Sequence, residues 1–194
     1  MKQKIINLLL ILIIIQMLIL IKLFINNIVA KKETAKELKS INYILNSKIG
    51  TPSKVDDIIK YEIIIEIPNI NLKKGILKKE DKDNNIDSNI TILAESKYPN
   101  EDGNIYIAAH SGNGNHSFFN DLVKLKMKDQ VYLYHKDIKY IYEINQVKEI
   151  SKNEKSSILT KNSNNLILIT CSQKDKNKYF IIILSKIKET EFEN

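Results

Sequence analysis

The sequence predicts a mainly β fold, either a closed barrel or a sandwich, with few helices and an apolar segment in front of it. From about residue 61 onward, short runs rich in β-branched and aromatic residues follow one another, and polar loops separate them. Many short strands with few helices are typical of closed barrels and sandwiches. The first part of the chain differs, because it contains the long apolar run Ile5–Phe24.

That N-terminal run is long enough to cross a membrane as a helix. Twenty helical residues extend about 30 Å, the thickness of a hydrocarbon core. Secretory signal peptides have shorter apolar regions of about 7–15 residues, so a membrane anchor over residues 1–30 is favoured over a cleaved signal. Small residues near Ala30 leave cleavage open as the alternative. Lysines lie on both sides of the run, so charge alone does not fix its orientation.

Residues 31–60 are predicted to form a juxtamembrane helical stalk. Within Thr34–Ser47, the apolar residues Leu38, Ile41 and Leu45 recur at helical spacing. A threonine followed three residues later by a glutamate gives this segment a capping box at its start. The strand-rich domain is therefore expected over residues 61–194.

The strands of this domain are expected in short segments, and one short helix interrupts them. The helix is predicted over Ser117–Lys126, where Phe118, Leu122 and Leu125 recur at helical spacing. The candidate strands are Tyr61–Ile67, Gly75–Leu77, Thr91–Leu93, Asn104–Ala109, Gln130–Tyr134, Lys139–Ile150, Leu166–Thr170 and Tyr179–Ile187.

The charge of the chain does not point to a nucleic-acid partner. The formal net charge is +7, and the 30 basic residues are all lysines. A basic protein can bind nucleic acid or anionic surfaces, but these lysines are spread over the chain and interleaved with acidic residues. A solvated surface is the better interpretation, and no nucleic-acid-binding motif is present.

Two predicted strands end in residues that can do chemistry together. Leu166–Thr170 is followed by Cys171, the single cysteine of the chain, which has no disulfide partner within it. Asn104–Ala109 is followed in the same way by His110. A cysteine and a histidine at the ends of two strands can form a nucleophile–base pair. The alternative is that Cys171 is a small buried hydrophobic residue, which is common for a lone cysteine in an apolar strand.

These motifs resemble those of the sortase family, the bacterial cysteine transpeptidases. Leu168–Cys171 fits the family's Thr-Leu-x-Thr-Cys strand. Ala109–His110 is followed by a phenylalanine and a leucine, as in the family, and Ile67–Ile70 resembles the family's opening Ile-Pro-Lys-Ile. The motifs agree in order and spacing, and the resemblance covers roughly Tyr61–Lys186.

The resemblance implies a closed sortase-type β-barrel of about eight strands with short helices, preceded by one transmembrane helix. It also implies an extracellular catalytic domain on a single-pass protein of the cell membrane. The expected partners are secreted proteins that carry a C-terminal sorting signal of the Leu-Pro-x-Thr-Gly kind, together with an amine nucleophile of the cell envelope.

The resemblance further assigns roles to particular residues. Cys171 is expected to attack the carbonyl group after the threonine of the signal, and His110 to move the protons. The family has an arginine on the strand after the cysteine, and here Lys178 takes that position. Lysine keeps the charge but lacks the planar fork of arginine, so a plain surface lysine is the alternative. Thr170 and Ser111 are expected to contact the substrate.

The departure from the arginine leaves two other functions open. One is a weakly active or inactive module that binds sorting signals, and the other is a thiol hydrolase that releases its substrate to water. Lys176 is the fallback for the positive charge, because residues two apart on a strand share a face.

Neither a metal nor an organic cofactor is expected. His116 is predicted to be exposed in the loop after the catalytic histidine, and His135 to be a surface turn residue; ligand spacings of a zinc site are absent. Asp81–Asn85 resembles the start of a calcium-binding EF-hand loop. Ile86 and Ile92 replace the glycine and the bidentate glutamate that such a loop needs, so a solvated loop is expected.

Overall fold

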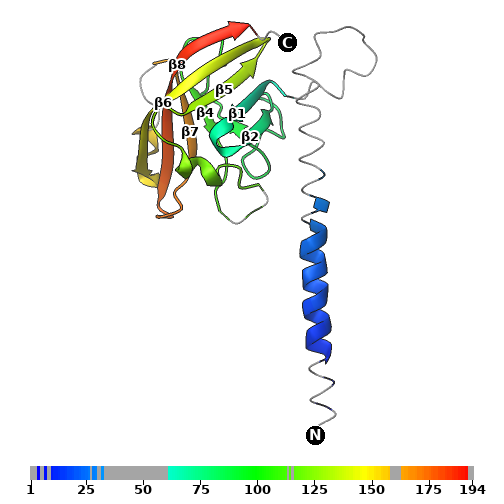
Figure 1. Cartoon of the computed structure of the whole chain (residues 1–194). Helices are drawn as coiled ribbons and strands as arrows, with labels where there is room; N and C mark the ends of the chain where they lie inside the picture. The colour runs from blue at the N-terminus through cyan, green and yellow to red at the C-terminus, as the bar shows by residue number, and fades with distance from the viewer. Residues whose placement is uncertain are drawn as a thin grey trace, which may run out of the picture. The chain divides into compact units, whose positions relative to one another are not determined.

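The computed structural model describes residues 4, 7, 10–26, 28–29, 32, 61–112, 114, 116–157 and 163–191, without the side chains of 155–157. The chain divides into two units, Met1–Lys39 and Ser40–Asn194. The predicted stalk lies almost wholly outside the described residues. In the first unit, residues 10–26 are helical (Figure 1), and their large apolar side chains are exposed.

Among the described residues, none of the helices combines the length and the apolar character that a membrane crossing requires.

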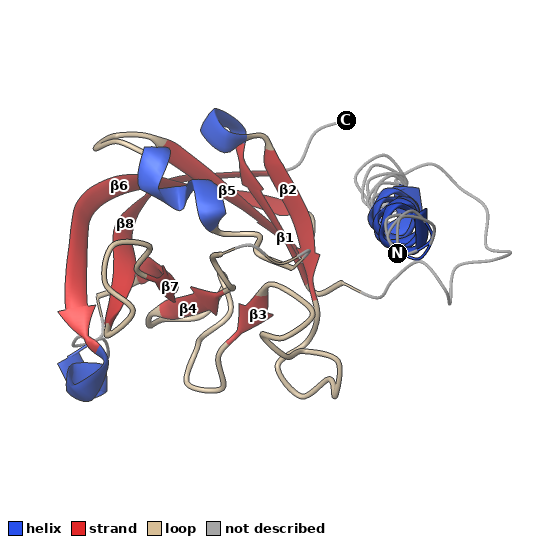
Figure 2. Cartoon of the chain, turned by 90° about the horizontal axis from the view of Figure 1, so that it is seen from below, coloured by secondary structure: helices blue, strands red, loops and turns tan. Residues whose placement is uncertain are grey.

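The second unit is built on one mixed sheet of eight strands in the order β2-β1-β5-β6-β8-β7-β4-β3. All neighbouring strands are antiparallel except β4 and β7. Figure 2 shows the strands arranged around a common interior. The strands are β1 Ile63–Ile67, β2 Leu72–Ile76, β3 Thr91–Ile92, β4 Ile105–Ala108, β5 Gln130–His135, β6 Ile138–Ser151, β7 Asn165–Cys171 and β8 Lys178–Glu191.

The barrel is nearly closed. β2 and β3 are the two edges of the sheet, and no ladder joins them within the described part of the chain. The predictions of a mainly β fold and of about eight strands are therefore confirmed, while the closure is less complete than expected. In the described residues of this unit, three short 3-10 helices accompany the strands: η1 Pro68–Ile70, η2 Asn120–Lys124 and η3 Lys152–Ser157. η2 is the short helix predicted over residues 117–126.

The interior of the barrel is one apolar core. Ile65, Ile107, Leu133, Leu168 and Ile182 are among its buried members, and they come from five different strands. Fully burying a side chain of this size stabilises a fold by about 1.5–3 kcal/mol. This core holds the strands in place and thereby fixes the positions of the strand ends.

A second apolar cluster covers the outer face of β7 and its neighbours. Ile167 and Ile169 of β7 lie in it, with Ala108 of β4 and Ile181 of β8. β7 is buried on both faces, which explains why its sequence is a continuous apolar run and does not alternate. Side chains two apart on a strand share a face, so Cys171 follows Ile169 on the outer face.

His135 lies in the interior, so the prediction that it is a surface turn residue is wrong. It is the last residue of β5 and only 3% exposed. Its Nδ1 lies 2.9 Å from the carbonyl oxygen of Glu62, and its Nε2 lies 3.0 Å from Oδ1 of Asn100. The ring also stacks on Tyr98, with centroids 5.3 Å apart. Long-range partners of this kind leave no signal near residue 135 in the sequence.

The loop between β2 and β3 contains the EF-hand-like segment, and hydrogen bonds from its own side chains stabilise it. Asn84 accepts a hydrogen bond from the backbone N–H of Ile92 (3.2 Å) and donates one to the carbonyl of Ile92 (2.9 Å). Oδ1 of Asp81 accepts from the N–H of Asp83 (2.9 Å). The loop thereby reaches from the edge strand β2 to the region of the strand ends.

Candidate active site

The cysteine and the histidine that the sequence pairs lie at the ends of neighbouring strands. β4 and β7 run parallel, with Ala108 opposite Ile169. Two residues beyond this pair, β4 leads to His110 and β7 leads to Cys171. Neighbouring strands lie about 4.8 Å apart, and parallel strands end at the same edge of a sheet. The structure therefore brings the backbones of these two residues together.

Hydrogen bonds fasten the two strand ends to each other. The N–H of Ala109 donates to the carbonyl of Ile169 (3.2 Å), and the Thr170 hydroxyl donates to the carbonyl of Ala109 (2.8 Å). The Ser111 hydroxyl donates to the carbonyl of Cys171 (2.7 Å). Thr170 is only 3% exposed, so its side chain joins the strands and does not face solvent.

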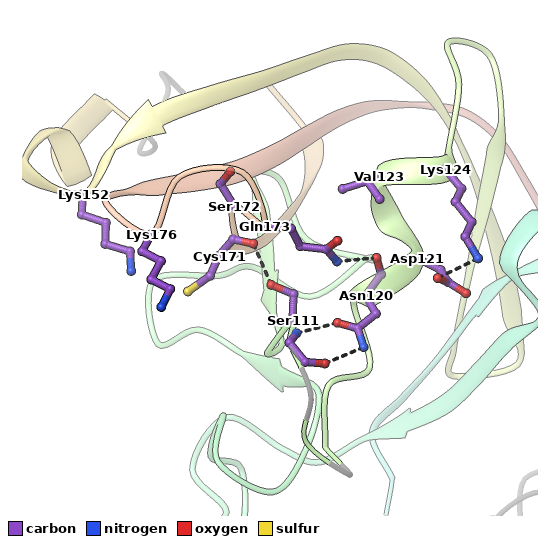
Figure 3. Close-up of a pocket in the computed structure, with 11 residues that line it drawn as sticks. Ser111, Asn120, Asp121, Val123, Lys124, Lys152, Cys171, Ser172, Gln173 and Lys176 are labelled. Carbon is purple, nitrogen blue, oxygen red and sulfur yellow. Dashed lines mark hydrogen bonds and ion pairs between the residues drawn. The ribbon is translucent and has the colours of Figure 1, made fainter.

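A hollow of about 730 Å³ opens beside the end of β7. Cys171, a partly buried free thiol, is part of its lining. Figure 3 shows the residues around it, which come from the loops after β4, β6 and β7 and from η2. The lining consists of Ser111, Gly112, Asn120, Asp121, Val123, Lys124, Lys152, Cys171, Ser172, Gln173 and Lys176.

Amide contacts fix one wall of this hollow. The Asn120 side chain donates to the carbonyl of Gly112 (2.8 Å) and accepts from its N–H (2.6 Å). The Gln173 side chain donates to the carbonyl of Asn120 (2.8 Å). Gly112 has a φ of +130°, which side chains other than hydrogen disfavour. The three residues therefore link the loop after β4, η2 and the loop after Cys171.

The loop after Cys171 is also held from within. The Ser172 hydroxyl accepts from the backbone N–H groups of Lys174 and Asp175, both at 3.1 Å. It donates to Oε1 of Glu149 on β6 (2.7 Å). These bonds keep the turn between β7 and β8 in one shape directly beside the thiol.

The imidazole of His110 faces the β2–β3 loop. Its Nε2 lies 3.3 Å from Oδ1 of Asp87, and 42% of the histidine side chain is exposed. The carbonyl oxygen of Asp87 lies 3.0 Å from Nδ1 of His116, which is exposed as predicted. His110 is not part of the lining of the hollow, although its backbone lies beside Cys171.

Lys178 is the first residue of β8, directly after the loop that follows Cys171. Its Nζ lies 3.7 Å from Oδ2 of Asp175, and both side chains are almost half exposed. Cys171 is opposite Tyr179 in the β7–β8 ladder, and successive side chains of a strand point to opposite faces. Lys178 therefore points away from the face of Cys171 and does not line the hollow, whereas Lys176 does.

Asp87 and Lys152 are charged residues of this region that were not predicted as site residues. Each is one charged residue in a polar loop, and no pattern in the flanking sequence sets it apart. Only the folded chain brings them beside the strand ends, because they come from the β2–β3 and β6–β7 connections.

Known proteins match this chain in sequence. The family model described as the sortase domain matches residues 65–187. Sortase A of Bacillus anthracis is 26% identical over 163 residues, which cover 80% of this chain and 77% of that protein.

Solved structures match it in fold. Sortase A of Listeria monocytogenes superposes with a TM-score of 0.58 at 22% identity and covers 68% of this chain and 90% of its own. The sortase D5 transpeptidase of Clostridium perfringens also gives a TM-score of 0.58, at 23% identity, and covers 66% and 79%. The family model spans more than half of the chain and includes both strand ends, so this protein belongs to the sortase family of cysteine transpeptidases.

Proposed function

We propose that this protein is a membrane-anchored cysteine transpeptidase that cleaves a C-terminal sorting signal of the Leu-Pro-x-Thr-Gly kind. It would transfer the resulting acyl group to an amine of the cell envelope. The observation that carries the proposal is the parallel pairing of β4 with β7, which ends at His110 and Cys171 beside a hollow. Membership of the sortase family supports the class of reaction.

In the proposed reaction, His110 takes the proton of the Cys171 thiol, and the sulfur forms a bond to the carbonyl carbon of the threonine in the signal. The carbon–nitrogen bond then breaks, and His110 gives a proton to the leaving amine, which leaves a thioester. An incoming amine attacks the thioester and forms a new amide bond as the carbon–sulfur bond breaks; His110 takes the proton of the amine and passes it to the leaving sulfur, which restores the thiol. These steps require neither a metal nor an organic cofactor.

His110 reaches this role by leaving its contact with Asp87. The contact is an exposed one at 3.3 Å, and exposed ion pairs contribute only about 0–1 kcal/mol. A change of side-chain rotamer therefore costs little. Catalytic hydrogen bonds are often long or absent before substrate binds, so the present geometry is compatible with a base.

For Lys178 we propose the role that the family gives to its arginine, which is to stabilise the negative charge on the carbonyl oxygen. Lys178 would have to leave its exposed pair with Asp175, again at small cost. Lys176, which lines the hollow, is the fallback. For Ser111 we propose a contact with the substrate, which its place in the lining supports. For Thr170 we propose a contact through its backbone, because its side chain is buried between the strands.

We also propose that the apolar run Ile5–Phe24 anchors the protein in the cell membrane, with the catalytic domain outside the cell. Its length and composition support an anchor. Protease treatment of intact cells should remove the catalytic domain. Digestion that requires lysed cells would show that the orientation is the reverse.

The alternative functions are a signal-binding module and a thiol hydrolase. The position of Lys178 beside Asp175, outside the hollow, favours the first of these. Incubation of the protein with a sorting-signal peptide, with and without an amine, separates the three functions. A transpeptidase gives a ligated product only when the amine is present. Cleavage without ligation indicates a hydrolase, and binding without cleavage indicates the module.

A further inference from the structure

Lys152 is a cation of the hollow that the reaction described above does not use. It follows the end of β6 and is the first residue of η3. Its backbone N–H donates to the carbonyl of Asn177 (2.9 Å), and Ser151 before it is opposite Lys178 in the β6–β8 ladder. The backbone of Lys152 is thus attached to the start of β8, directly beside the loop that follows Cys171.

An aromatic ring holds the Lys152 ammonium on the side of the thiol. The Nζ of Lys152 lies 5.5 Å from the centroid of the Tyr179 ring, within the range of a cation–π interaction. Tyr179 is opposite Cys171 in the β7–β8 ladder, and opposed residues project to the same face of a sheet. Tyr179 also packs on the second apolar cluster, which keeps the ring in place.

The carboxylates around the hollow have other partners. Asp121 lies 2.9 Å from Nζ of Lys124, and Glu149 accepts the hydrogen bond from the Ser172 hydroxyl. Within the described part of the chain, no carboxylate lies at ion-pair distance from Lys152. None of the described carboxylates therefore pairs with its positive charge. In Figure 3 its side chain extends on the same side of the hollow as the Cys171 sulfur.

We propose that Lys152, held by Tyr179, is a catalytic cation of the transpeptidation reaction. When the sulfur of Cys171 bonds to the substrate carbon, the π electrons of the carbonyl move onto its oxygen. The ammonium of Lys152 donates a hydrogen bond to this oxyanion and keeps its own proton throughout. A donor already in position gives such charge its largest stabilisation. This inference rests on the proposed function, and it adds a cation from the β6–β7 connection to the one that is proposed on β8.

The test measures kcat and KM of the full chain with a sorting-signal peptide and an amine. Lys152→Met should lower kcat by about 10²–10³-fold with little change in KM, the typical effect of losing an oxyanion donor. Lys152→Arg should restore most of the rate. Lys139→Met is the matched control, because Lys139 lies 3.7 Å from the centroid of the Tyr132 ring but does not line the hollow; it should be as active as the wild type.

Tyr179 provides a second test that does not alter the cation. Tyr179→Phe keeps the ring and should keep the activity, whereas Tyr179→Leu should lower kcat by about tenfold because the ammonium loses its support. Combined with Lys152→Met, Tyr179→Leu should add little further loss, as expected for two residues that act as a unit. Thermal unfolding of each variant separates this effect from a loss of folding.

The outcomes distinguish this inference from the proposed function. A wild-type chain that forms no thioester with the peptide overturns both. An active wild type with a fully active Lys152→Met variant overturns the role of Lys152 alone. A variant with raised KM and unchanged kcat would also overturn it, because Lys152 would then bind the peptide without favouring the transition state.

Discussion

Neighbouring residues position Cys171, and its own packing contributes little. The partly exposed thiol ends β7, while Ser111 holds its carbonyl and the Ser172 hydroxyl shapes the turn that follows. The residues that are proposed to carry chemistry are thus separable from those that carry stability. Thr170, by contrast, is buried and joins two strands.

Cys171→Ala should abolish formation of the thioester and leave thermal unfolding nearly unchanged. The thiol is at a strand end beside a hollow, so its removal leaves little empty volume in the core. Mass spectrometry after incubation with a sorting-signal peptide detects the thioester, and calorimetry gives the unfolding temperature. A large loss of stability would instead favour the interpretation of Cys171 as a buried hydrophobic residue.

Lys178→Ala should lower kcat by about 10²–10³-fold if Lys178 stabilises the oxyanion, while peptide binding changes little. Lys178→Arg should retain or improve the activity, because arginine adds the planar fork. Lys176→Ala, measured alongside, is the comparison, because Lys176 lines the hollow and Lys178 does not. A fully active Lys178→Ala variant would refute its assignment.

At the scale of elements, the edge strand β2 depends on one glycine. A Cβ atom at Gly75 would collide with the ring of Tyr61, which precedes β1. The absence of a side chain at this position therefore lets the ring lie directly on the strand. Gly75 is also opposite Ile64 in the β1–β2 ladder, so a shift of the backbone would disturb the pairing.

Gly75→Val should destabilise the domain by about 1–3 kcal/mol, the usual cost of overpacking. Tyr61→Ala makes room for the new side chain, so Gly75→Val should cost much less in a Tyr61→Ala background. Urea denaturation of the four chains gives the coupling free energy. Equal costs in the two backgrounds would show that the ring is not the obstacle.

Strand positions could be predicted from the sequence because most of them depend on local patterns. β5 alternates, and β7 is a continuous apolar run, so both were found within one residue of their observed ends. The first part of β2, Leu72–Lys74, was missed because two of its residues are lysines. These residues belong to the sheet because they pair with β1, a different segment of the sequence.

The candidate site could be predicted only in part, for the same reason. Cys171 and His110 end strands that have clear patterns, so their positions followed from the sequence. The contacts of Asp87 with His110 and of Lys152 with Tyr179 join segments that are far apart in the sequence. The orientation of Lys178 follows from the register of β8 against β7, and a register shift of one residue would reverse it.

At the scale of the whole molecule, one buried and one partly buried phenol should make the fold sensitive to alkali. Burial is the main cause that raises the pKa of both Tyr134 and Tyr142, and the hydrogen bond to Glu66 raises that of Tyr134 further. In the unfolded chain, phenols lose their protons near about pH 10. Above that pH, unfolding releases the protons of these two phenols. The free energy of unfolding is therefore unaffected by them below that pH and falls as the pH rises above it.

The urea midpoint should fall as the pH rises beyond about 10. The ultraviolet absorbance of phenolate from these two residues should appear only together with unfolding. Tyr142→Phe, which cannot ionise, should weaken the dependence on pH. A urea midpoint that stays constant over the pH range in which both phenols become fully ionised would contradict the raised pKa values.

The parallel pair β4 and β7 also determines when the protein becomes reactive during its synthesis. Ala109 and Thr170, whose hydrogen bond joins the two strands, are 61 positions apart in the chain. His110 therefore leaves the ribosome well before Cys171, and the thiol gains its neighbour only after β5, β6 and β7 exist. β8 is synthesised still later and pairs with the other edge of β7. An incomplete chain thus carries the proposed base without the proposed nucleophile, so the proposed capacity to join proteins would arise only with the last part of the fold.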